Sequence, residues 1–311
     1  GGLSGPAGLA AGLNALFVAD SENNRIVRID IENDGDGDGQ SDQFEENLIV
    51  TDGGNNQVIR IYEDGYRQVL SDNGTGGGPS FIQLRDISIE PSGSYLVTDS
   101  GYPGVLRVDR DSGDRSMVSD ESGNFGTGVP LTNIDRITIG NDGAVYVTVG
   151  FDHPGFDPFP ALLRIDPNSG DRNILSGLDE SGLEIGSGGV GTFFGDPSDI
   201  DFNKLTGHIF VADLFGPSVF SVDPFDPTPE SPSGNRVLRV HNSQGTGTAL
   251  VEPVALALWE DKVLMLDTDS SHDNGAVLLA DLNSNGDRSI FSADGQGHDF
   301  VNAVDVVAGF N

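Results

Sequence analysis

One short pattern, an apolar strand that ends in aspartate, recurs along the chain at intervals of roughly fifty residues. The complete copies are Leu16–Asp20, Leu48–Asp52, Tyr95–Asp99, Ile209–Asp213 and Val263–Asp267. A further copy, Val145–Val149, has lost the aspartate. A unit of this size cannot bury its own apolar face, so the repeat predicts an architecture in which neighbouring units pack against each other.

The rest of each unit also reads as short β-strands. A second apolar strand follows each copy, then a turn and a third strand, and a fourth strand opens the next unit. The turn reads Ser-Gly-Asp or Asn-Gly-Asp at 112–114, 169–171 and 285–287, where glycine supplies the positive φ of a tight hairpin. With 44 Gly and 16 Pro, the chain shows no sustained helical periodicity.

Four antiparallel strands per unit, repeated around a ring, form a β-propeller. We therefore expect an all-β fold in which residues 1–311 form a single six-bladed propeller domain, with five or seven blades left open. The C-terminal Asn302–Val307 resembles an opening strand and is expected to pair with Leu16–Asp20, which closes the ring. The first unit is short, because only residues 31–47 separate its second strand from the next unit. A degenerate blade, or a five-bladed ring with an N-terminal extension, also fits this spacing.

An inserted calcium loop is predicted at residues 34–45, within that short connection. Carboxylates occupy positions 1, 3, 5, 9 and 12 of a twelve-residue loop, and Gly39 occupies position 6. Calcium takes six to eight oxygen ligands, and the glycine permits the sharp turn that wraps the loop around the ion. The predicted ligands are Asp34, Asp36, Asp38, the backbone carbonyl of Gln40, Asp42 and Glu45. We therefore expect Ca²⁺ as a cofactor, with a solvated acidic turn as the alternative.

The charge of the chain restricts its partners and its location. With 49 acidic and 16 basic side chains, the formal net charge is −33. Such a charge repels nucleic acid and anionic membrane surfaces, and calcium or salt would relieve its self-repulsion. Cysteine is absent, and no apolar run is long enough to span a bilayer. The chain begins with Gly1, which we interpret as a sign of a processed or trimmed chain. Because calcium-rich surroundings or high salt suit this charge, we expect an exported protein outside the cell or at its surface, with the periplasm as another option.

The units resemble NHL-type propeller repeats, and more closely a bacterial variety marked by the motif Ser-Gly-Asp-Arg. In that variety a strand ending in Val-Asp leads through this motif to a Gly-Thr-Gly loop, as at 109–128 and more loosely at 233–247. The resemblance spans nearly the whole chain and implies a fold and export rather than an activity. The superfamily is also similar to gluconolactonase-like enzymes, whose central channel holds a divalent metal.

Two repeated side-chain sets are expected to be architectural. The strand-end aspartates could ring one mouth as ligands, but near-identical copies favour a role in capping the following loop, since a catalytic site breaks symmetry. The arginines after the Gly-Asp turns are expected to pair with carboxylates on the blade surface, and they are Arg115, Arg172, Arg236 and Arg288. The segment Asp281–Asp287 resembles half a calcium loop and is interpreted as a hairpin turn, with weak calcium binding as the alternative.

Two long insertions are candidates for a binding face, or for a plug in the channel: Gly150–Pro160 and Gly177–Gly195. The aromatic residues in or near them are Phe151, Phe156, Phe159, Phe193, Phe194 and Phe215. The five histidines form no zinc-binding pair, although His153 and His272 lie in equivalent loops that could face one mouth.

The expected function is a non-enzymatic one. We predict an exported calcium-binding propeller that binds a protein or glycan partner, itself included, at the cell surface or in the extracellular matrix. The alternative is a metal-dependent hydrolase or lactonase with a second ion in the channel. Its candidate ligands are Asp86, Asp135, Asp199 and Asp305. These positions are repeat-related, which weakens the enzyme interpretation without removing it.

Overall fold

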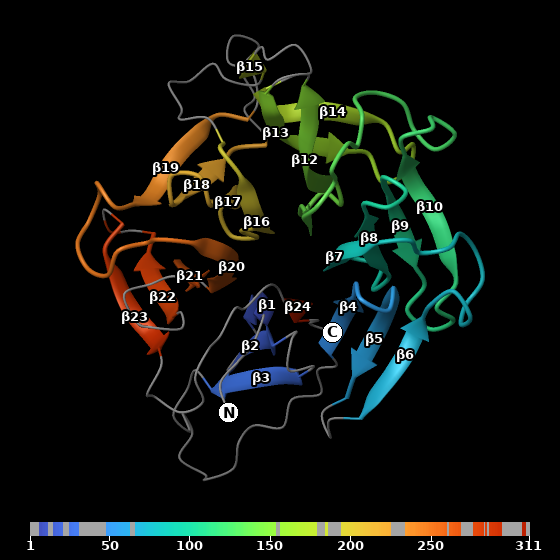
Figure 1. Ribbon diagram of the computed structural model, residues 1–311, viewed down its shortest axis with the longest axis horizontal. Helices are drawn as coiled ribbons and strands as arrows, with labels where there is room; N and C mark the ends of the chain where they lie inside the picture. Colours follow the sequence, from blue (N-terminus) through green and yellow to red (C-terminus); the bar gives the residue numbers. More distant parts are fainter. Residues whose placement is uncertain are drawn as a thin grey trace.

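The protein folds into antiparallel sheets arranged around a ring (Figure 1). The computed structural model describes residues 6–11, 15–20, 25–30, 48–62, 66–153, 156–178, 184–185, 194–224, 234–259, 261–268, 276–282, 284, 286–293 and 307–308. Regular structure in these ranges is entirely β-strand. Among them no helix is long and apolar enough to cross a membrane. The all-β propeller predicted from the repeat is confirmed.

We number the sheets as blades in chain order. Blade 1 holds β1 (Pro6–Ala11), β2 (Ala15–Asp20) and β3 (Arg25–Asp30). Blade 2 holds β24 (Val307–Ala308), β4 (Leu48–Asp52), β5 (Gln57–Ile61) and β6 (Arg67–Ser71). Blade 3 holds β7 (Leu84–Ile89), β8 (Tyr95–Asp99), β9 (Gly104–Val108) and β10 (Arg115–Asp120).

The remaining blades have the same plan. Blade 4 holds β11 (Ile137–Ile139), β12 (Val145–His153), β13 (Phe156–Ile165), β14 (Arg172–Leu178) and β15 (Glu184–Ile185). Blade 5 holds β16 (Pro197–Phe202), β17 (Ile209–Asp213), β18 (Ser218–Val222) and β19 (Arg236–His241). Blade 6 holds β20 (Pro253–Trp259), β21 (Lys262–Asp267), β22 (Ala276–Asp281) and β23 (Arg288–Ala293). Blades 2 to 6 thus have four or five strands, whereas blade 1 has three in the described part of the chain.

The C-terminal strand closes the ring, but its partner differs from the prediction. β24 pairs with β4, in the register Val307 to Ile49, and not with β2. The predicted pairing with Leu16–Asp20 is wrong because β2 already has a neighbour on each side, β1 and β3. This arrangement also explains the short first unit. Since β24 supplies the opening strand of blade 2, the connection at 31–47 does not have to.

The core lies between adjacent blades. Side chains alternate along each strand, so Leu96 on β8 joins the apolar cluster shared with blade 4, whereas Val97 joins the cluster shared with blade 2. Both side chains are fully buried. Strands packed on both faces read as continuous apolar runs, which is the pattern that the repeat shows in the sequence. Blade-to-blade packing is therefore what stabilises the ring.

The insertion at Gly150–Pro160 was expected from the sequence to be irregular, but it forms a long hairpin. β12 and β13 extend into it, and Phe151 pairs with Phe159 in the ladder. The pairing continues beyond the blade as far as His153 opposite Phe156. This hairpin projects from blade 4, and its base forms part of the wall of a cavity at one mouth of the ring.

Candidate functional site at one mouth of the propeller

The strand-end aspartates cap loops. Asp99 accepts the N–H groups of Gly101 and Tyr102, in the loop after its strand, at 2.9 and 3.2 Å, as predicted. The aspartates also bind a second segment, which the sequence did not indicate. Asp99 accepts hydrogen bonds from the backbone N–H groups of Ile82 and Gln83, at 2.7 and 2.9 Å. In blade 5, Asp213 accepts the equivalent pair from Gly195 and Asp196, at 2.7 and 3.2 Å. In blade 6, Asp267 does the same for residues 251 and 252. Each carboxylate therefore holds the segment that leads into the opening strand of its own blade, which fixes the shape of this mouth.

Two of the candidate channel ligands are used for a different purpose. Asp86 is buried, and its two carboxylate oxygens accept N–H groups of Ile87 and of Ile137 in the next blade, at 2.8 and 2.7 Å. Asp199 likewise links its own blade to Leu256 of blade 6, at 2.7 Å. Oxygens engaged in this way have reduced capacity to bind a metal. Asp305 lies outside the described residues, and Asp135 lines the cavity at the mouth.

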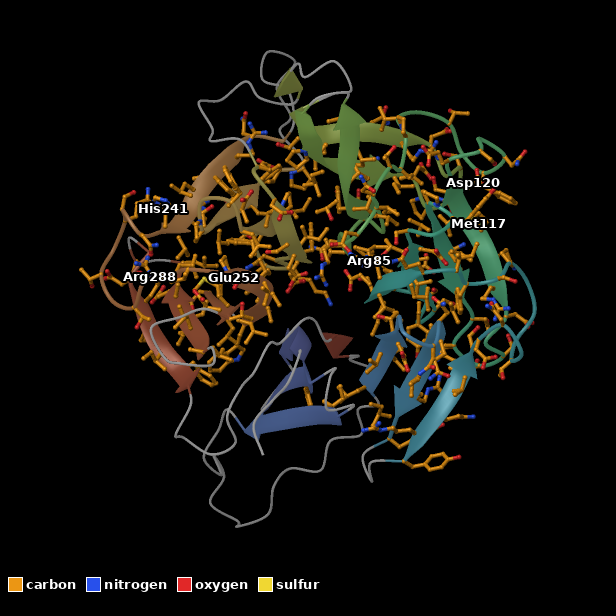
Figure 2. The ribbon with its side chains drawn as sticks, viewed as in Figure 1. Arg85, Met117, Asp120, His241, Glu252 and Arg288 are labelled. Atoms are coloured by element: carbon orange, nitrogen blue, oxygen red, sulfur yellow. The ribbon has the colours of Figure 1, made fainter. Side chains whose placement is uncertain are left out.

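The prediction for the Ser-Gly-Asp-Arg arginines is wrong. Arg115, Arg172, Arg236 and Arg288 are all buried, so they do not lie on the blade surface. Arg172 donates to the carbonyl oxygens of Val129 and Asp120 and to the hydroxyl of Ser119, all at 2.8 Å. These acceptors belong to the preceding blade and its exit loop. The same relation holds between blades 5 and 6, where Arg288 donates to the backbone carbonyl of His241 at 3.0 Å. Figure 2 labels these two residues on the neighbouring blades.

The Gly-Thr-Gly loops make a second set of contacts between neighbouring blades, with the Ser-Gly-Asp-Arg turns. Asp171, in the Ser-Gly-Asp-Arg turn, accepts the backbone N–H of Thr127 at 2.8 Å. The N–H of Arg172 donates to the carbonyl of Thr127 at 2.7 Å, and Gly128 forms an isolated parallel bridge with Arg172. Asp287 and Thr246 repeat the arrangement between blades 5 and 6. The motif thus joins neighbouring blades through contacts between residues 44 and 41 positions apart, which no local spacing reveals.

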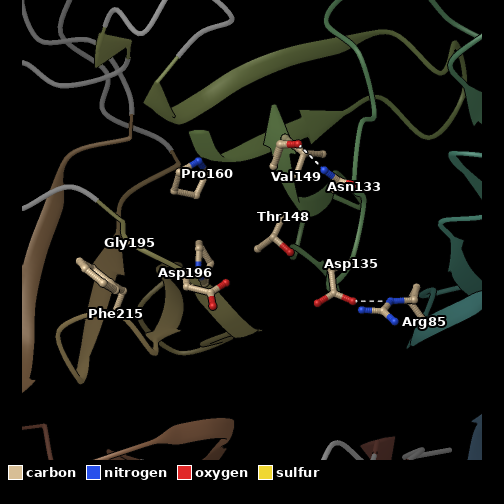
Figure 3. A pocket seen from close by; sticks show the side chains of 11 residues that line it. Arg85, Asn133, Asp135, Thr148, Val149, Pro160, Gly195, Asp196 and Phe215 are labelled. Carbon is tan, nitrogen blue, oxygen red and sulfur yellow. Dashed lines mark hydrogen bonds and ion pairs between the residues drawn. The ribbon is translucent and has the colours of Figure 1, made fainter. Parts of the chain in front are cut away.

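A cavity of about 460 Å³ opens at the mouth where the capped segments lie. It is built from segments of blades 3, 4 and 5, and Figure 3 shows it from close by. Its lining residues are Arg85, Asn133, Asp135, Thr148, Val149, Gly150, Pro160, Gly195, Asp196, Pro197 and Phe215. The projecting hairpin of blade 4 contributes Gly150 and Pro160. The wall is therefore polar on one side and apolar on the other.

The charged groups of the cavity are unevenly paired. Arg85 donates through Nε to Asp135 at 2.8 Å, and the second oxygen of Asp135 lies 3.5 Å from Nε of Arg136. No such partner for the Asp196 carboxylate exists among the described residues, and its pKa is raised by burial and by the negative charge of Asp135. Beneath it, burial raises the pKa of Asp213 to about 6. The carboxylate that lacks a described cationic partner is thus on the blade 5 side of the cavity, whereas Asp135 on the blade 4 side is paired with Arg85.

Of the aromatic residues singled out in the sequence, Phe215 is the one that the structure places at the cavity. Its side chain is 82 % exposed, in the turn between β17 and β18. Phe194 is buried instead, packed edge-on against Phe220. For Phe151, Phe156 and Phe159 only the backbone is described, and Phe193 lies outside the described residues. Tyr102 is also an exposed aromatic residue in the corresponding turn of blade 3, between β8 and β9. An aromatic residue in the turn after a strand-end aspartate is therefore the signal that could have marked Phe215.

The predicted calcium loop lies outside the described residues, with all of its ligands: Asp34, Asp36, Asp38, Gln40, Asp42 and Glu45. In the part of the chain that is described, no three His, Asp or Glu side chains gather in a way that could hold a metal ion. His272 is also outside that part, and only the backbone of His153 is described. The half-loop at Asp281–Asp287 joins β22 to β23 with Gly286 at φ 79°, which confirms the hairpin interpretation.

Known structures share the propeller fold. No protein-family model and no curated protein sequence matches the chain. A structure of a nidogen/laminin complex matches with a TM-score of 0.60 and 15% identity, over 97% of each chain. A gluconolactonase from Xanthomonas campestris matches with 0.56 and 15%, over 85% of this chain and 75% of its own. Virginiamycin B lyase from Staphylococcus aureus matches with 0.52 and 15%, over 94% and 85%. At these identities the likeness shows the fold, a β-propeller, and neither a family nor an activity.

Proposed function

We propose that this chain is an exported, calcium-binding β-propeller, of the Ser-Gly-Asp-Arg repeat type, that binds a partner protein through the mouth bearing Phe215. The observation that carries the proposal is the distribution of exposed apolar side chains. Phe215, Ile82, Phe125 and Tyr102 are 82%, 53%, 48% and 42% exposed. Phe215, Ile82 and Tyr102 lie in turns after second strands or just before opening strands, which the alternating strand direction places at one end of the blades. Phe125 follows β10 and adjoins the loop that contacts blade 4. Leu205 and Tyr66, 81% and 62% exposed, lie at the other end.

The repeated motifs make structural contacts, which leaves other residues of the chain for binding a partner. The strand-end aspartates and the Ser-Gly-Asp-Arg turns are occupied by loop capping and blade-to-blade contacts. What remains for recognition are loops on a rigid scaffold, where binding residues are commonly found. Exposed aromatic side chains surrounded by polar groups are typical of protein interfaces. A propeller with the same fold is found in a nidogen/laminin complex, which agrees with a role in protein association.

Calcium at residues 34–45 would rigidify the connection between blades 1 and 2 and reduce the repulsion within a chain of charge −33. Calorimetric titration of wild type and of the Asp36→Ala/Asp38→Ala double variant tests this part. One site that the double variant loses supports the proposal. No heat with the wild type, or a site that survives in the variant, contradicts it.

The partner-binding face is tested by affinity capture from the secreted and surface proteins of the source organism. Phe215→Ser should abolish capture of any specific partner. Leu205→Ser is the matched control, because Leu205 is 81% exposed at the other end of β17. Equal loss in both variants, or in neither, would refute a role for this mouth.

A second candidate is the metal-dependent hydrolase, which the similarity to a gluconolactonase favours weakly. Against it, Asp86 and Asp199 are engaged by backbone N–H groups. Hydrolysis of a panel of lactones and esters, with and without chelator, decides between them. Turnover that EDTA abolishes in the Asp36→Ala/Asp38→Ala variant would establish an active second metal and replace the binding-module proposal.

A further inference from the structure

The two carboxylates of the cavity stand on opposite sides of it. Figure 3 shows Asp135, from the segment before β11, and Asp196, from the segment before β16, with both carboxylates directed into the space between them. Asp135 is balanced by Arg85 at 2.8 Å and by Arg136 at 3.5 Å. The carboxylate of Asp196 receives no hydrogen bond and no ion pair from the described residues, although its backbone carbonyl accepts the N–H of Leu214 at 2.9 Å. Asp196 is an exposed residue, so its carboxylate is accessible to a ligand that supplies positive charge.

The wall beside Asp196 is apolar. Phe215 lies next to it, so close to the chain that a Cβ on Gly195 would lie 2.5 Å from the Phe215 Cβ. Pro197 and Pro160 continue this wall. An exposed ring beside a carboxylate matches a side chain with an apolar stem and a cationic head, since the stem packs on the ring and the head reaches the carboxylate.

We infer that the cavity receives a single basic side chain, a lysine or arginine, from the partner protein. The inference rests on the proposed function and specifies the chemistry of its contact. The head group is placed between Asp196 and the outer oxygens of the Asp135–Arg85 pair, and the stem lies along Phe215. The net charge of −33 attracts basic surfaces over a long range and so increases the rate of encounter.

Other ligand chemistries fit less well. An anion would meet the carboxylate of Asp196 and the negative field of the whole chain, and the cation of the cavity, Arg85, is already paired with Asp135. A bare divalent cation needs six or more oxygen ligands, whereas the described residues bring no three acidic or imidazole groups together. A purely apolar ligand would leave Asp196 without a partner. A monovalent organic cation satisfies both sides of the cavity.

The inference is tested with small probes by ligand-observed NMR on the calcium-saturated protein. The probes are Nα-acetyl-lysine N-methylamide, its arginine analogue, and the norleucine and glutamate analogues as controls. The two cationic probes should bind saturably, more weakly at high salt, and the norleucine and glutamate probes should not. Binding of norleucine as tight as that of lysine, or no binding of either cation, would overturn the inference.

Variants locate the site. Asp196→Asn should weaken cation binding by about fivefold, the effect expected for one partly exposed ion pair. Asp111→Asn makes the same charge change in the turn before β10, at the far end of the blade, with a side chain 87% exposed. It should leave the affinity unchanged. Equal weakening by both variants would show a general electrostatic effect and no specific cavity.

Failure here is distinguishable from failure of the proposed function. If Phe215→Ser abolishes partner capture but no cationic probe binds, the mouth is an interface whose cavity does not take a basic side chain. If capture is insensitive to Phe215→Ser and the cations still bind, the cavity recognises small amines and the protein-binding proposal fails. If neither effect is found, both are wrong.

Discussion

The carboxylate of Asp86 on β7 accepts the backbone N–H of Ile137 on β11 at 2.7 Å, across the boundary between blades 3 and 4. Asp199 on β16 makes the same contact with Leu256 on β20, also at 2.7 Å. Strands of different blades form no ladder at these points, so each carboxylate satisfies a buried donor that would otherwise lack a partner. The inner ring is therefore joined by side chains as well as by apolar packing.

Replacing Asp86 tests this role. Asp86→Ala leaves the N–H of Ile137 without an acceptor at a buried position, so we expect a loss of about 1–3 kcal/mol in the free energy of unfolding. Urea denaturation measures it. Asp111→Ala removes an exposed carboxylate and should change stability by less than about 0.5 kcal/mol. If the two variants are equally stable, the contact between Asp86 and Ile137 has no stabilising role.

The arginine of the Ser-Gly-Asp-Arg turn gives a second prediction. Arg172→Met removes three donated hydrogen bonds at 2.8 Å and leaves buried carbonyl groups without donors, so we expect a loss of about 2–4 kcal/mol. Arg164→Met is the control, because Arg164 is a partly exposed residue of the same blade that pairs with Asp142 at 3.2 Å. Thermal unfolding should show a much lower midpoint for Arg172→Met alone. A similar midpoint for both variants would support the surface role that the sequence suggested.

The sequence predicted the features that depend on local spacing and missed those that depend on partners far along the chain. Apolar runs ending in Asp predicted the strands that lie second in each sheet, such as β8 and β17. Gly113 and Gly170 have the positive φ that the hairpin turns required. The acceptors of Arg172, in contrast, lie between Ser119 and Val129, and nothing next to the arginine reveals them. The sequence predicts exposed ion pairs between these arginines and carboxylates because arginine side chains are usually exposed. A buried arginine that donates to several carbonyl groups is an exception to this rule.

The same reasoning applies to the ring closure and to the cavity. The opening-strand pattern of Asn302–Val307 was recognised, but β1 was not, so β2 was thought to have a free edge. The cavity is formed by six separated stretches of the chain, four of which include Arg85, Asp135, Asp196 and Phe215. Their proximity results from the circular order of the blades, and no motif in the chain records it.

Close approach of the Gly-Thr-Gly loop to the next blade gives a third prediction. A Cβ on Gly126 would lie 1.9 Å from the carbonyl oxygen of Gly170, whereas a Cβ on Gly143 would meet nothing within 4 Å. Both glycines have φ near +78°. Alanine at either position therefore carries the same backbone penalty, about 1 kcal/mol, and only Gly126→Ala adds a clash with backbone. The unfolding midpoints of the two variants measure the difference, and equal midpoints would mean that the loop does not contact blade 4 so closely.

The pH dependence of stability provides the last prediction. Burial raises the pKa of Asp213 to about 6, well above that of an aspartate in the unfolded chain. Below about pH 4 the group is protonated in both states, so its contribution is fully present there. Between about pH 4 and pH 6 the folded protein keeps a proton that the unfolded chain has lost. Stability therefore falls as pH rises through this range, by about 1–3 kcal/mol for this group.

The difference between wild type and Asp213→Asn isolates the effect of this residue. Other carboxylates act in the opposite direction. The backbone N–H groups of Asn168 and Ser169 lower the pKa of Asp166, so its contribution is lost as pH falls. Urea denaturation at intervals between pH 4 and pH 7 should therefore show that Asp213→Asn gains stability relative to wild type as pH rises. The Asp166→Asn difference should stay constant over this range and shrink only below about pH 4, where wild type loses the contribution of Asp166. Parallel curves for wild type and Asp213→Asn would mean that Asp213 ionises in its ordinary range, and that its two backbone hydrogen bonds outweigh its burial.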